Sequence, residues 1–103
     1  MGDHLPQAFR METHRTAGAD VVRIYGELDL VHGDEVQLAL ESASDDVVVD
    51  LSELEFVDST GLSSLLLARR HLEGRGHALE IRGARGAVRK VFEAAGLADV
   101  LDD

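Results

Sequence analysis

Residues 47–62 read VVVDLSELEFVDSTGL, and this stretch decides the fold. The run at 47–51 is short and rich in β-branched residues, which predicts a strand buried on both faces of a sheet. An apolar-striped helix is expected to follow, with Asp58 as its N-cap. Ser59 and Thr60 would then occupy the first two helical positions. There, the free backbone amides and the positive end of the helix dipole favour a phosphate group.

Hydrophobic periodicity on both sides of this stretch predicts the remaining elements. Strands are expected at 8–14, 21–25, 47–51 and 78–81, and helices at 31–44, at 59–73 and from about 88 to 95. Two strand–helix–strand crossovers in this order imply parallel strand pairs, and the first strand adds antiparallel at an edge. The sequence therefore predicts an α/β fold. It is a small mixed four-stranded sheet, with an antiparallel edge strand and the remaining strands parallel, covered by about three helices.

Length and composition restrict the classes of protein. A single domain is expected to span residues 1–103, with a flexible lead-in at 1–7. The net charge of -10 would repel nucleic acid and anionic lipid, so neither is an expected partner. The absence of cysteine and of a membrane-length apolar run is compatible with a cytoplasmic protein. The 5 histidines lack zinc-site spacing, and we expect neither a metal nor a cofactor.

Three short motifs occur in order along the chain. They are GELD at 26–29, VDLS at 49–52 and FVDSTGL at 56–62. In this combination and at these separations, they resemble the signature of STAS domains, and specifically of bacterial anti-sigma factor antagonists. The resemblance extends over residues 9–101, which is nearly the whole chain.

The resemblance implies a partner-switching role in transcription regulation. The unphosphorylated domain would bind an anti-sigma factor, often a serine kinase of the histidine-kinase-like ATPase fold, and so release the sigma factor. That kinase would phosphorylate the serine after Asp58, which is Ser59 in this chain. A PP2C-type phosphatase would reverse the modification, making this chain a phosphoprotein.

The candidate site follows from the motifs and from helix geometry. Ser59 is the expected phosphorylation site, and Thr60 is the weaker candidate. The partner-binding residues are expected to be Asp29, Asp58, Ser59, Thr60, Gly61 and Leu67. Asp29 and Asp58 are each expected to cap a helix as well. Leu67 is an apolar residue on an otherwise polar helix face, where it could contact the partner.

Other functions fit the sequence less well. A serine hydrolase would need Gly-x-Ser-x-Gly, but Val57 stands where the first glycine belongs. A phospho-aspartate receiver would need a lysine after a late strand, whereas Lys90 falls inside the last predicted helix. We therefore expect no enzymatic activity. One alternative within the family stays open, namely a non-switching STAS scaffold subunit of a stress-sensing or lipid-transport complex.

Overall fold

The computed structural model describes residues 8–102, and its elements follow the predicted order with one strand added. The expected flexibility of residues 1–7 lies outside the described part. The elements are β1 (Arg10–Thr16), β2 (Ala19–Leu28), α1 (Gly33–Glu41), β3 (Asp46–Asp50), β4 (Leu54–Val57), α2 (Ser59–Gly74), β5 (Leu79–Arg82), α3 (Gly86–Ala94) and the short 3-10 helix η1 (Ala98–Val100).

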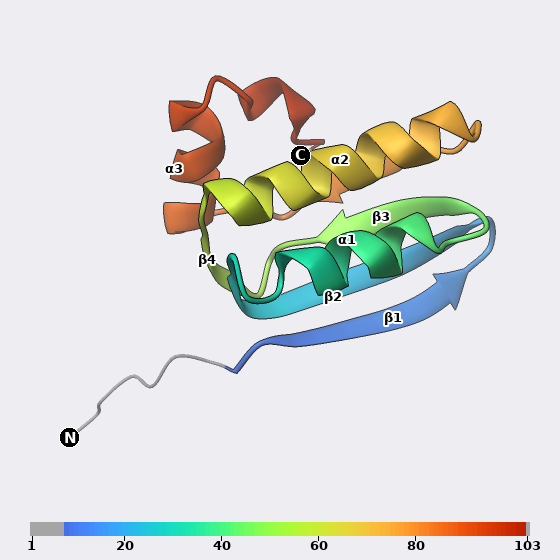
Figure 1. Cartoon of the computed structure of the whole chain (residues 1–103), viewed down its shortest axis with the longest axis horizontal. Coiled ribbons are helices and arrows are strands. Elements are labelled where there is room, and N and C mark those ends of the chain that lie inside the picture. The colour runs from blue at the N-terminus through green and yellow to red at the C-terminus, as the bar shows by residue number, and fades with distance from the viewer. Residues whose placement is uncertain (1–7, 103) are drawn as a thin grey trace.

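The sheet has the predicted mixed topology. Its strand order is β1-β2-β3-β5, with β1 antiparallel to β2 and the other neighbours parallel. Figure 1 shows the long β1 and β2 hairpin and the two helices α1 and α2, which pack against each other. The α/β fold class with one antiparallel edge strand is therefore confirmed.

The added strand, β4, pairs in parallel with the end of β2. The register shifts between Gly26 and Glu27, and Gly26 has a positive φ of 84° that suits glycine. This irregularity lets β2 pair first with β3 and then with β4. The sequence did not predict β4 because a four-residue segment shows too little periodicity.

The helices cover one face of the sheet, so the prediction that residues 47–51 are buried on both faces is wrong. Val47 and Val49 of β3 are buried, whereas Val48 and Asp50 between them are half-buried. The opposite face carries polar pairs such as the ion pair between Arg23 and Asp50, at 3.0 Å. A short apolar run in the sequence looks the same whether a strand is buried on one face or on both. Val48 shows why, because it lies on the face without helices and its strand neighbours alone shield it in part.

The helices supply the other half of the core. The predicted apolar stripe of α2 is largely confirmed, with Leu62, Leu65, Ala68 and Leu72 buried. Helix α1 is shorter than the predicted 31–44, because the chain enters it through a turn. Its buried residues, together with those of α3, complete a core that contains Val36, Leu40, Val88 and Phe92.

Candidate functional site

The site lies where β2 and β4 end side by side. Leu28 and Val57 are register partners at the parallel ends of these strands, so Asp29 and Asp58 leave the sheet at the same edge. The GELD and DSTG motifs, which are distant in sequence, therefore meet in space. This edge lies beside the start of α2 (Figure 1).

Asp58 starts α2 as predicted. Its backbone is extended, and its carboxylate accepts a hydrogen bond from the Gly61 amide at 2.8 Å. This satisfies one of the amides that a helix start leaves without an intrahelical partner. Ser59 and Thr60 consequently occupy the first two positions of the helix.

Gly61 allows α2 to approach β2 closely. A Cβ atom built at this position would lie 2.3 Å from the Leu28 carbonyl oxygen. The same oxygen accepts a hydrogen bond from the Asp58 amide at 3.2 Å. Only a residue without a side chain therefore fits, and this contact fixes the first turn of α2 against the sheet.

The two neighbouring hydroxyl groups have different surroundings. The Thr60 hydroxyl donates to the Asp58 carboxylate at 2.6 Å, and this bond, with that of the Gly61 amide, lowers the pKa of Asp58. Ser59 is exposed, and within residues 8–102 its side chain makes no hydrogen bond. The hydroxyl of Ser59 is therefore the one that a modifying protein could reach without breaking an existing interaction.

Asp29 does not cap α1, which corrects the sequence prediction. The residue at the N-cap position of α1 is His32, whose side chain makes no capping bond. The Asp29 carboxylate instead accepts from the Val31 amide at 3.1 Å, and its carbonyl accepts from the Gly33 amide at 2.8 Å. Asp29 thus stabilises the turn before the helix, as Asp side chains commonly do.

That turn is joined directly to the start of α2. The Asp58 carboxylate lies close enough to the Leu30 backbone for it to help lower the pKa of Asp58, after the larger effects of the Thr60 hydroxyl and the Gly61 amide. Gly33 packs against Ser64 of α2, because a Cβ atom at Gly33 would lie 2.7 Å from the Ser64 hydroxyl. The turn between β2 and α1 therefore flanks Ser59.

Leu67 lies on the same exposed face of α2 as Ser59. The exposed residues in this part of the helix are Ser59, Thr60, Ser63, Leu67, Arg70 and His71. Leu67 is 49% exposed, and at 1.5 Å per residue it lies about 12 Å along the helix from Ser59. A partner that covers the helix start could thus reach this apolar side chain as well.

Two further apolar residues were not predicted as part of the site. Leu30 and Val31, which directly follow the GELD motif, are 75% and 76% exposed. Next to them, the ring of His32 stacks on Phe9 with ring centroids 3.9 Å apart. Two consecutive apolar residues in a turn, where polar residues are usual, were the signal that could have identified them.

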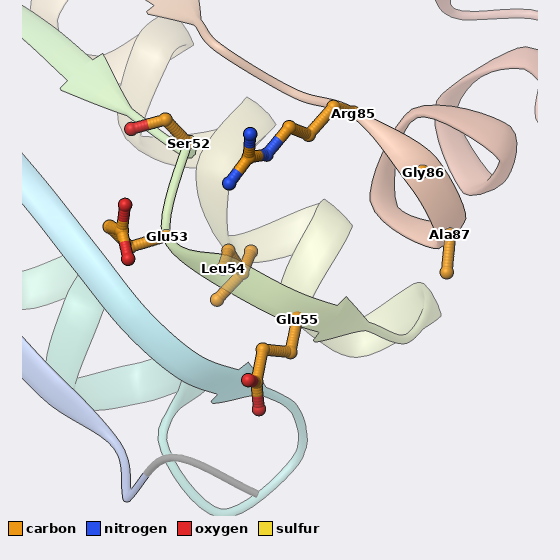
Figure 2. Close-up of a pocket in the computed structure, with 7 residues that line it drawn as sticks. All are labelled: Ser52, Glu53, Leu54, Glu55, Arg85, Gly86 and Ala87. Atoms are coloured by element: carbon orange, nitrogen blue, oxygen red, sulfur yellow. The ribbon is translucent and has the colours of Figure 1, made fainter. Parts of the chain in front are cut away.

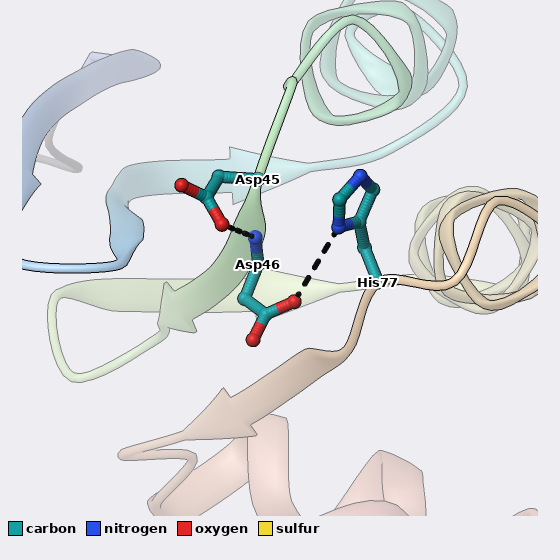
Figure 3. A group of neighbouring side chains, drawn as sticks. All are labelled: Asp45, Asp46 and His77. Atoms are coloured by element: carbon teal, nitrogen blue, oxygen red, sulfur yellow. Dashed lines mark hydrogen bonds and ion pairs between the residues drawn. The ribbon is translucent and has the colours of Figure 1, made fainter.

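A cluster of possible metal ligands lies elsewhere, at the start of β3. Asp45, Asp46 and His77 bring ligand atoms within 4.8 Å of one another (Figure 3). The carboxylates are already engaged, because Asp45 pairs with Arg15 at 2.8 Å and Asp46 accepts from the Ala78 amide at 3.0 Å. This cluster therefore links strands and gives no reason to assign a metal.

A shallow groove of about 280 Å³ lies between the β3–β4 connection and the start of α3 (Figure 2). Glu53, Glu55 and Arg85 contribute charges of both signs to its lining. The mixed lining selects no class of ligand. Separately, no helix in the described part of the chain is long and apolar enough to cross a membrane.

Comparison with known proteins defines the class. A family profile described as "Mlab, STAS domain" matches residues 11–102. The anti-sigma-B factor antagonist of Listeria monocytogenes is 31% identical over 83 residues, which is 77% of this chain and 73% of that protein. This chain belongs to the STAS domain family.

Solved structures agree with the assignment. The anti-sigma factor antagonist SpoIIAA in its unphosphorylated form matches with a TM-score of 0.77 and 28% identity, over 93% of this chain and 87% of that one. The phosphorylated form of the Bacillus cell fate determinant SpoIIAA matches with a TM-score of 0.69 and 27% identity, over 93% and 90%. Within the family, the chain therefore groups with the anti-sigma factor antagonists.

Proposed function

We propose that this chain is an anti-sigma factor antagonist that is switched by phosphorylation of Ser59. Its unphosphorylated form binds an anti-sigma factor, a serine kinase of the histidine-kinase-like ATPase fold, and so releases a sigma factor in the cytoplasm. Phosphoryl transfer to Ser59 abolishes this binding, and a PP2C-type phosphatase restores it. The chain acts in this scheme as a binding protein and as a substrate, without catalysing a reaction itself.

The observation that carries this proposal is the contrast between two adjacent hydroxyl groups. Ser59 presents an exposed hydroxyl, while the hydroxyl of Thr60 is held by Asp58. A solved relative that carries phosphate and an unphosphorylated counterpart, both of similar fold to this chain, support a modification of this kind. Thr60 is accordingly the weaker acceptor.

The helix start suits a phosphate on Ser59 for electrostatic reasons. A phosphate adds roughly 1.5 to 2 negative charges, and the amides at the N-terminus of a helix favour an anion. The fold can hold this charge, so the main effect falls on the interface. Burying the charge against a partner without a basic counterpart costs several kcal/mol, and each 1.4 kcal/mol is about tenfold in affinity.

The remaining residues of the proposed surface divide into two groups. The first group fixes the first turn of α2 and consists of Asp58, Thr60 and Gly61. These residues hold Ser59 in its exposed position and contribute little of the contact area themselves. Leu67 is the apolar contact on the exposed face of α2. Asp29 organises the neighbouring turn and adds negative charge to the edge of the surface.

Phosphorylation by purified serine kinases of the source organism tests the proposal. The chain is incubated with each kinase and ATP, and the peptide that contains Ser59 is analysed by mass spectrometry. We expect one phosphate on Ser59, none in Ser59→Ala, and unchanged incorporation in Ser63→Ala, which removes an exposed serine one turn along the same helix. Lack of incorporation with every kinase would favour the non-switching scaffold subunit.

A further inference from the structure

Helix α1 and the turn that precedes it present an unusual amount of apolar surface to solvent. Among the described residues, the three most exposed large hydrophobic side chains are Leu30, Val31 and Leu38, at 75%, 76% and 68%. They lie within nine consecutive residues that include the entry turn and the first part of α1. Single exposed leucines are common, but three on one short segment indicate a surface that is covered in a complex.

The charges on this helix all have the same sign. Asp34, Glu35 and Glu41 are its charged residues, and α1 carries no basic residue in its last turn. Asp34, Leu38 and Glu41 line one shallow groove together with Gln37. The exposed leucine is thus bordered by carboxylates, which is the complement of an apolar site surrounded by Lys and Arg.

This surface is continuous with the region around Ser59. The entry turn packs against the first turns of α2, because a Cβ atom at Gly33 would lie 2.7 Å from the Ser64 hydroxyl and 3.7 Å from the carbonyl oxygen of Thr60, the residue after Ser59. From Gly33 to Leu38 the chain follows α1, a rise of about 7.5 Å at 1.5 Å per residue. A protein that covers the start of α2 can therefore extend onto the outer face of α1.

We infer that the entry turn with Leu30 and Val31, together with the outer face of α1 that carries Asp34, Glu35, Leu38 and Glu41, is a second docking surface for the anti-sigma factor. The partner segment that fits it carries an apolar side chain, which packs on Leu38, and basic residues, which face the carboxylates. This inference rests on the proposed function and adds a contact remote from the phosphorylated serine.

Two other occupants fit the charges less well. A second copy of the chain docked through the same face would place Asp34, Glu35 and Glu41 against their own like charges, as a symmetric dimer requires. An anionic membrane surface would be repelled by the same carboxylates. A basic protein surface is the occupant that satisfies both the apolar and the charged groups.

The test uses the full chain and the purified anti-sigma factor kinases of the source organism, with binding measured by calorimetry. Leu38→Ala should weaken binding about tenfold, because as the central apolar contact of this surface Leu38 should belong to the minority of interface residues whose truncation costs more than about 1 kcal/mol. The variant should keep the thermal midpoint of the wild type, since Leu38 is exposed. Asp34→Asn, Glu35→Gln and Glu41→Gln together should weaken binding and reduce its dependence on salt.

A charge-matched control separates a local effect from a change in net charge. Glu53→Gln, Glu93→Gln and Asp99→Asn remove three exposed carboxylates outside α1, and they should change binding far less. Equal effects of the two triple variants, or wild-type affinity in Leu38→Ala, would overturn the second docking surface and leave the proposed function standing. The second docking surface would also be overturned, and the proposed function would stand, if Leu38→Ala abolished self-association in sedimentation and left kinase binding unchanged. No binding by the wild-type chain to any of these kinases would overturn both.

Discussion

Replacing Gly61 by alanine sets two physical effects of opposite sign against each other. Alanine is a better helix former than glycine by about 1 kcal/mol, so propensity alone predicts a more stable protein. At this position, however, the new Cβ would lie 2.3 Å from the Leu28 carbonyl oxygen and 2.9 Å from the Leu28 Cγ. The nearest atom belongs to the backbone of β2, which cannot rotate away as a flexible side chain would.

The clash should dominate. To restore even 3.0 Å between the Cβ and the Leu28 oxygen, the start of α2 must move by several tenths of an ångström. Forced overpacking of this kind typically costs 1–3 kcal/mol, which exceeds the gain in helix propensity. We expect a net loss of up to about 2 kcal/mol in the free energy of unfolding, together with a displaced Ser59 and slower phosphorylation.

Urea unfolding of Gly61→Ala and Gly74→Ala measures this difference. Gly74 lies at the end of the same helix, and a Cβ there meets nothing within 4 Å. Gly74→Ala should therefore stabilise the protein by up to about 1 kcal/mol. If Gly61→Ala proved as stable as Gly74→Ala, the close approach of α2 to β2 would not limit this position, and the reasoning would be refuted.

Three further predictions concern the same turn. Ser59→Ala should bind the anti-sigma factor constitutively and Ser59→Asp poorly, and equal affinities in calorimetry would count against the switch. Thr60→Val should leave phosphorylation of Ser59 intact while the pKa of Asp58 rises toward its ordinary value of 3.8, as NMR titration can show. Because the pKa of Asp58 is lowered in the fold, its carboxylate stabilises the protein above about pH 4. This contribution is lost as the pH falls through the lowered folded pKa. Urea titrations of Asp58→Asn should therefore show a smaller loss of stability below about pH 4 than the wild type shows.

The sequence predicted the parts of the fold that depend on long periodic segments. The stripe of α2 and its N-cap at Asp58 were both correct, because an eight-residue or longer helix repeats its pattern and an N-cap has its own residue preference. The topology followed from element order and the handedness of crossovers. The four residues of β4 carried no such repeat, and their pairing with β2 depends on a register shift at Gly26 that local patterns do not reveal.

The sequence indicated the residue types of the candidate site better than it indicated the contacts that these residues make. Asp29 was expected to cap a helix, but the chain makes a full turn between Asp29 and α1. The Asp29 carboxylate therefore accepts a hydrogen bond from the Val31 amide instead. The exposure of Leu30 and Val31 depends on how that turn is oriented against α2, which is a tertiary property. The sequence alone does not determine whether hydrophobic side chains in a turn are buried or exposed, because this depends on where the neighbouring helix packs.

At the start of α2, the groups that build the helix are separate from the Ser59 hydroxyl, which we propose is phosphorylated. Asp58 bonds to Thr60 and to the Gly61 amide, and none of these bonds involves the side chain of Ser59. A phosphate on Ser59 can therefore be added or removed without loss of the cap that holds the helix start in place. In the proposed switch, phosphorylation would then act on partner binding, through the charge that a partner would have to bury, rather than through unfolding of the site. Such a switch would be reversible, because each form would retain the fold that the proposed kinase or phosphatase has to recognise.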